Sequence, residues 1–161
     1  MDGSPDSLIS SKIVQKPKKV SAHRLTKLEA PEPNLTHSVI CKEGSVEITL
    51  PIRTVSEGNC FEPWQKKHKR HKSQKRQISL LFSMIKQKPT LPCKLKFTRY
   101  APRTLDKHDN LPISFKWLCD QICSELTGNY VAGRADDSDQ IEISYDQVKS
   151  KEYGIKIQIN F

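Results

Sequence analysis

Two groups of acidic residues stand out in a chain of 161 residues whose formal net charge is +9. The first lies within residues 105–112, LDKHDNLP, and the second within residues 135–141, ADDSDQI. Carboxylate oxygens suit a hard divalent cation, and Mg²⁺ usually takes one or two carboxylates together with waters or substrate phosphates. Two or three aspartates that converge from separate elements are what metal-assisted hydrolysis of a phosphodiester needs. The alternative is ordinary turn and helix-cap chemistry, which favours Asp, Asn and Ser as well.

The segment between the two acidic groups has the pattern of an amphipathic helix. Its apolar residues recur at steps of three and four, which predicts a helix over residues 113–127. Asp109 or Asn110 can cap its start, and Pro112 suits its first turn. Gly128 is a ready stop. One acidic group therefore precedes the helix and the other follows it before a strand, and we expect both to reach the same edge of a sheet.

A dense block of positive charge occupies residues 65–76, QKKHKRHKSQKR. Apolar residues with helical spacing follow it, so we predict one helix from about Trp64 to Lys86, with an exposed basic first half and an amphipathic second half. Such a block repels itself and normally faces an anionic partner, here the phosphates of DNA. A solvated helix face and a nuclear localisation signal are the other interpretations. The cations expected to contact DNA are Lys66, Lys67, Lys69, Arg70, Lys72, Lys75 and Arg76.

Four further segments alternate apolar and polar residues, which is typical of strands with one buried face. They begin near residues 46, 91, 141 and 153, and the last two are expected to form an antiparallel hairpin. The element order is strand, helix, strand, helix, strand, strand. This order predicts an α+β (mixed α/β) domain over residues 44–161, with a single sheet of about four strands and helices on one face.

Residues 1–43 have a different composition from the rest of the chain. Proline and glycine interrupt them and no apolar period persists, which predicts a mostly disordered basic arm. The start of the chain also lacks the pattern of a secretory signal, and no apolar run approaches the ~20 residues of a membrane span. Five cysteines without matching metal-ligand spacing predict free thiols and a reducing compartment, the cytoplasm.

The two acidic motifs and their order resemble the RusA family of Holliday-junction resolvases. That family has an Asp-x-Asp-Asn-Leu-x-Lys motif and a later Asp-Asp-x-Gln motif. Asp-Asn-Leu at residues 109–111 is similar to the first, and Asp-Asp-Ser-Asp-Gln-Ile at residues 136–141 is similar to the second. Residues 48–51, followed by Ser56 and Asn59, are similar to the family's first strand and the loop after it.

The resemblance covers roughly residues 45–160. Asp109 and Asp137 match the second aspartate of each family motif. Lys107 stands where the family has its first aspartate, and Ile113 stands where it has its lysine. These two departures weaken the inference of full activity and support the alternative of a relative that has kept the fold and the nucleic-acid binding but not the chemistry.

The resemblance implies an endodeoxyribonuclease that acts in DNA recombination and repair, resolving four-way (Holliday) DNA junctions as a homodimer with Mg²⁺, or Mn²⁺ in its place. The implied catalytic residues are Asp106, Asp109, Asp137 and Lys116, and the implied metal ligands are Asp106, Asp109, Asp136 and Asp137. Three further cations beside the first motif are expected to bind phosphates, namely Arg99, Arg103 and Lys107.

Two functions of other classes stay open on the sequence. One is a catalytically impaired RusA-like protein that binds nucleic acid without cutting it. The other is a protein–protein interaction module that uses the basic helix as a docking surface. Dependence of cleavage on a divalent ion separates an enzyme from a binding protein, and salt-dependent DNA binding separates both from an interaction module.

Overall fold

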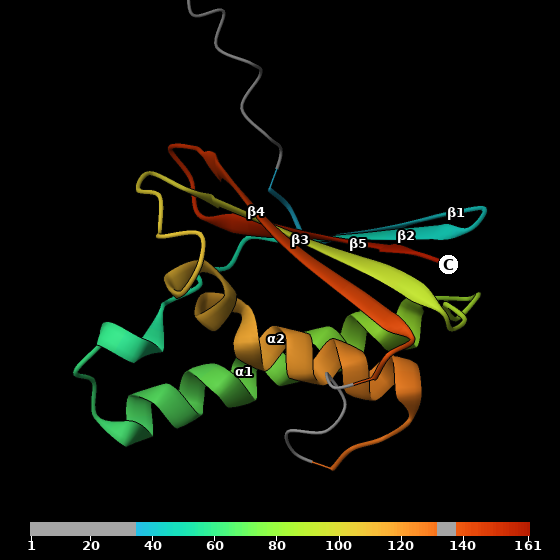
Figure 1. Cartoon of the computed structure of the whole chain (residues 1–161), viewed down its shortest axis with the longest axis horizontal. Coiled ribbons are helices and arrows are strands. Elements are labelled where there is room, and N and C mark those ends of the chain that lie inside the picture. The colour runs from blue at the N-terminus through green and yellow to red at the C-terminus, as the bar shows by residue number, and fades with distance from the viewer. Residues whose placement is uncertain (1–34, 132–137) are drawn as a thin grey trace, which may run out of the picture. The chain divides into compact units, whose positions relative to one another are not determined.

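The computed structural model of this chain describes residues 35–131 and 138–161. These residues form a single mixed sheet with two α-helices packed against it (Figure 1). In chain order, the elements are β1 (Ser38–Lys42), β2 (Ser45–Leu50), a short 3-10 helix η2 (Glu57–Asn59), α1 (Trp64–Met84), β3 (Cys93–Ala101), α2 (Asn110–Thr127), β4 (Ile141–Lys149) and β5 (Gly154–Asn160). This confirms the predicted α+β class.

The sheet has five strands where the sequence predicted about four. The additional strand is β1, which lies within the segment that the sequence assigned to the N-terminal arm. It pairs antiparallel with β2 through a turn at Gly44, whose φ of 68° is a left-handed conformation that glycine adopts readily. Three of the five residues of β1 are exposed at the edge of the sheet. The apolar alternation that reveals a half-buried strand is therefore weak in this segment.

The predicted hairpin between the last two strands is wrong. The strand order is β1-β2-β5-β3-β4, so β3 lies between β4 and β5. β4 pairs parallel with β3, while β5 runs antiparallel to both β2 and β3. Alternation of apolar and polar residues shows which face of a strand is buried, but it does not identify the neighbouring strand. The turn after β4 has only to cross two strand spacings, roughly 10 Å, to pass β3.

Both helices lie on the same side of the sheet and pack against each other (Figure 1). The core between helices and sheet contains Phe97 of β3 packed against Phe115 of α2, with ring centroids 5.2 Å apart. In α1 the buried residues all lie from Gln74 onward. The first half of α1 therefore adds no side chain to the core, as the change of pattern along this helix predicted.

All five cysteines lie in the described residues and are free thiols, as predicted, and three of them are buried. Within the described residues, neither helix is apolar enough over a sufficient length to cross a membrane.

Candidate nucleic-acid interface

The loop after β2, the loop after β3 and the start of α2 lie at one end of the sheet (Figure 1). β2 and β3 are each antiparallel to β5, so they point the same way and their loops emerge together. Ser56 in the first loop donates a hydrogen bond to Oδ1 of Asn110, the first residue of α2, at 2.6 Å. The loop after β2 and the turn that carries the first acidic group are therefore neighbours at this end.

The first acidic group forms the turn that leads into α2. The Oδ2 atom of Asp106 accepts a hydrogen bond from the Asp109 N–H at 3.3 Å, and its carbonyl oxygen accepts one from the Leu111 N–H at 2.9 Å. Asp109 precedes the helix without capping it through its side chain, and both aspartates are exposed. Asp106 thus performs turn chemistry, the alternative interpretation of this motif, while the Asp109 carboxylate is presented to solvent.

The described part of the second acidic group lies at the opposite end of the sheet. Asp136 and Asp137 are outside the described residues, but Ser138 and Gln140 are within them. The carbonyl oxygen of Gln140 accepts a hydrogen bond from the N–H of Cys93, the first residue of β3, at 2.9 Å. Asp106 follows the other end of this nine-residue strand, which is roughly 26 Å long.

This separation corrects the expectation that both acidic groups reach one edge of the sheet. Because β3 and β4 are parallel, α2 carries the chain back to the end where β3 began. Across residues 35–131 and 138–161, no three His, Cys, Asp or Glu side chains come together as metal ligands. Among the described residues of one chain, the first acidic group therefore has no partner from the second group with which to form a metal site.

Arg99 is buried, with only 7% of its surface exposed. It lies on the face of β3 that carries Leu95 and Phe97, which is the face covered by the helices. Its Nε donates a hydrogen bond to the Thr54 hydroxyl at 3.1 Å, and its Nη1 donates one to the Arg103 carbonyl oxygen at 2.7 Å. Burial lowers the pKa of Arg99 from its ordinary value. This arginine fastens two loops together, and a surface contact with DNA phosphates is not available to it.

The other cations of the first acidic turn are at the surface. Arg103, Lys107 and Lys116 are all exposed. Lys116 lies on α2, and Ile113, one turn before it, is partly exposed beside Gly58 of η2. The exposed side of this turn therefore carries lysines on the helix and on the loop, as predicted.

Most of the basic first half of α1 faces solvent. Lys69, Lys72 and Arg76 follow one another at steps of three and four, so they lie along one side of the helix. That side is opposite the buried Gln74 and Ile78. Lys66 is exposed as well, whereas Lys67 and Lys75 are half-buried. In the described parts of the chain, the only members of α1 with ion pairs are Arg70 and His71.

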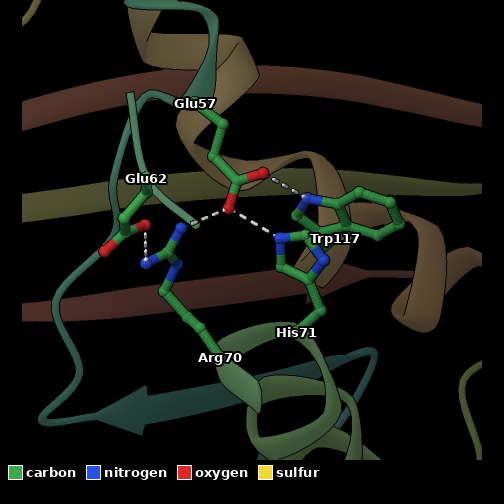
Figure 2. Close-up of polar contacts among 5 residues, drawn as sticks. All are labelled: Glu57, Glu62, Arg70, His71 and Trp117. Atoms are coloured by element: carbon green, nitrogen blue, oxygen red, sulfur yellow. Dashed lines mark hydrogen bonds and ion pairs between the residues drawn. The ribbon is translucent and has the colours of Figure 1, made fainter. Parts of the chain in front are cut away.

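Arg70 departs from the prediction because it turns inward to two carboxylates (Figure 2). Its Nη2 lies 2.6 Å from Oε1 of Glu57, and its Nη1 lies 2.7 Å from Oε2 of Glu62. The same Glu57 oxygen lies 2.6 Å from Nε2 of His71. The other carboxylate oxygen of Glu57, Oε2, accepts a hydrogen bond from Nε1 of Trp117 at 3.3 Å. We call these five residues the Glu57 cluster.

The Glu57 cluster ties three elements together while staying charged. Burial raises the pKa of Glu57, but hydrogen bonds from Arg70, His71 and Trp117 outweigh burial, so the pKa lies below its ordinary value. Burial likewise opposes the charge on Arg70, but its hydrogen bonds to the two glutamates raise its pKa. The His71 and Trp117 rings stack with centroids 3.9 Å apart. Sequence patterns missed this cluster because both glutamates lie in an aperiodic loop.

Two aromatic side chains project beside the Glu57 cluster. Phe61 is fully exposed, and Trp64, the first residue of α1, is 67% exposed. Trp64 makes an edge-to-face contact with the ring of His68, with centroids 5.7 Å apart. The sequence pattern marks Trp64 only as the start of the helix, because periodicity does not reveal an aromatic side chain that faces solvent.

No protein-family model matches this chain, and a comparison with well-characterised proteins finds no significant match to its sequence.

Proposed function

We propose that this protein binds DNA through the basic first half of α1 and acts as a Mg²⁺-dependent endodeoxyribonuclease on four-way junctions. The observation that carries DNA binding is the row of exposed cations Lys69, Lys72 and Arg76 along one side of α1. No carboxylate of the described residues neutralises these three side chains, so they are available to phosphates. For location we propose the cytoplasm, supported by the five free thiols.

Hydrolysis is supported by the turn that leads into α2. The Asp109 carboxylate is exposed, Asp106 precedes it, and oxygen ligands of this kind suit Mg²⁺ or Mn²⁺. When bound, the ion would lower the pKa of an attacking water and offset charge on the phosphate. Lys107 and Lys116 are exposed near the same turn and would stabilise the leaving oxygen.

A complete ligand set would require two chains. The first acidic group and the described residues of the second lie at opposite ends of β3. A two-fold dimer that brought the first group of one subunit to the second group of its partner would form this contact twice, because isologous symmetry repeats every contact. The homodimer implied by the resemblance would in this way place two identical composite sites on a symmetric junction.

DNA binding without cleavage is the second candidate. The distance between the acidic groups within one chain favours it, as do Lys107 and Ile113 at positions where the family has its aspartate and lysine. A binding protein needs only the α1 surface, whereas an enzyme also needs the second acidic group to arrive from elsewhere.

The deciding experiment incubates the protein with a labelled four-way junction and with a linear duplex, with and without Mg²⁺ or Mn²⁺. Symmetric cuts in the junction that require the ion support the nuclease. Salt-dependent binding without cuts under either ion supports the binding protein. Binding to neither DNA refutes both and leaves the protein interaction module.

A further inference from the structure

Phe61 and Trp64 place two bare aromatic surfaces at the tip of the loop that enters α1. Aromatic side chains bury a large apolar area when they contact a partner. Two exposed aromatic side chains so close in sequence therefore indicate a binding surface. Trp64 keeps one edge against His68, which leaves most of the indole open.

The loop that carries Phe61 is held on both sides. Glu62, the next residue, is paired with Arg70, and Glu57, four residues before, is paired with Arg70 and His71 (Figure 2). The Glu62 N–H also bonds to the carbonyl oxygen of Cys60 at 3.1 Å. An aromatic ring on an anchored loop loses little conformational freedom when it binds a ligand. The Glu57 cluster therefore holds this loop in place and leaves the Phe61 ring exposed.

Positive charge surrounds this tip. Lys66 and Lys69 follow Trp64 within the next turn and a half of α1, and both are exposed. Exposed aromatic rings combined with nearby cations are how proteins bind unpaired nucleotides, because bases stack on the rings while phosphates meet the lysines. A purely apolar partner would leave these lysines without a counter-charge.

We propose that Phe61 and Trp64 form a stacking platform for unpaired bases at the branch point of DNA. This inference rests on the proposed DNA binding and adds the source of selectivity. In a linear duplex the faces of the bases are already stacked on one another, so only the cations of α1 act. At a branch point bases can leave the stack, and their faces become available to the two rings.

The experiment compares Phe61→Ala, Trp64→Ala and the double variant with the unmodified protein. Binding is measured by fluorescence anisotropy at one fixed salt concentration, on a four-way junction and on a linear duplex of the same arm sequence. Each substitution is expected to weaken junction binding roughly tenfold, while duplex binding changes less than about twofold. Trp64→Phe keeps a ring and should restore most of the affinity. Leu80→Ala, at an apolar position further along α1 whose exposure is close to that of Trp64, is the matched control and should change neither affinity.

A second readout locates the contact. A 2-aminopurine base at the branch point should be quenched by the unmodified protein and by the Leu80→Ala variant, and not by the double variant. Equal losses on junction and duplex, or no loss on either, overturn the platform. A dimer that dissociates in the double variant, seen by sedimentation, also overturns it by assigning the rings to a contact between subunits. Failure of cleavage leaves this binding test unaffected, whereas failure of the unmodified protein to bind any DNA refutes the proposed function itself.

Discussion

Arg70 binds Glu57 at 2.6 Å although it comes from the middle of the densest basic run in the chain. Its neighbours Lys69 and Lys72 are exposed, so the run contains both cations that face solvent and a cation that fastens the fold. The partition follows from helix geometry, because residues one apart in sequence point about 100° apart around the helix. Charge on a helix is therefore not evidence of binding until its direction is known.

Replacing Arg70 by Gln should lower the free energy of unfolding by about 1–2 kcal/mol, because two half-buried carboxylates lose their charged partner. Lys69→Gln, the neighbouring control, should leave stability within about 0.5 kcal/mol because its side chain is exposed. Urea unfolding followed by circular dichroism measures both. Equal stability of the two variants would mean that the Glu57 cluster does not hold the loop in solution.

The Glu57 cluster should also make stability depend on acid. The native pKa of Glu57 lies below its ordinary value of 4.5, so the native state binds fewer protons there than the unfolded state does. The contribution of the ionised Glu57 carboxylate to the free energy of unfolding is complete at neutral pH. It is lost as the pH falls from about 4.5 through the native pKa. The stability difference between the unmodified protein and Glu57→Gln should therefore shrink as the pH falls below about 4.5. Urea midpoints at pH 7, 5, 4 and 3 provide the measurement, and a difference that persists unchanged at pH 3 contradicts it.

Removing the outward cations should weaken DNA binding without harming the fold. The triple variant Lys69→Gln, Lys72→Gln and Arg76→Gln removes three charges from one side of α1. Every cation that no longer neutralises a phosphate reduces the slope of log K against log salt by about 0.9 on duplex DNA, so the slope should fall by up to roughly 2.7. Anisotropy titrations between roughly 50 and 200 mM salt, where affinity for DNA falls steeply, measure this slope. An unchanged slope would show that this side of α1 does not meet DNA.

A composite active site predicts that two inactive variants restore activity when mixed. Asp109→Asn and Asp137→Asn should each abolish Mg²⁺-dependent cleavage and leave junction binding intact. In a mixed dimer, one composite site receives both substitutions and the other receives neither. Exchange of subunits after mild denaturation should therefore recover cleavage, limited to one strand per junction. If each site is built within one chain, the mixed dimer recovers no cleavage, and this result would refute the two-chain arrangement.

The strand β1 predicts where the N-terminus can be cut. A deletion of residues 1–34 keeps all of the described structure, whereas a deletion of residues 1–43 removes β1 and Leu35. Leu35 is buried against Gly154, and losing a buried leucine alone costs about 2–3 kcal/mol. The longer deletion should therefore unfold at clearly lower urea concentration than the shorter one. Equal midpoints would mean that β1 adds nothing to the stability of the sheet.

Sequence periodicity determined the elements of this protein well. The steps of three and four in α2 and in the second half of α1, and the alternation in β2, β3 and β5, each arise because one face of an element is buried. Such a pattern is local, so it can be recognised in the sequence without knowing which segments are neighbours in the fold. It also showed that the first half of α1 carries no core residues. The α+β class followed from the order of these elements.

Tertiary structure decided everything that depends on which segments become neighbours. The parallel pairing of β3 with β4 separates the described residues of the second acidic group from Asp106 by the length of a strand. The inward turn of Arg99 and Arg70 depends on loops whose sequence has no period. The Glu57 cluster itself is assembled from η2, α1 and α2 (Figure 2). A local pattern shows which face of a segment is buried and which is exposed to solvent. The packing of distant segments against one another depends on all the segments of the chain together.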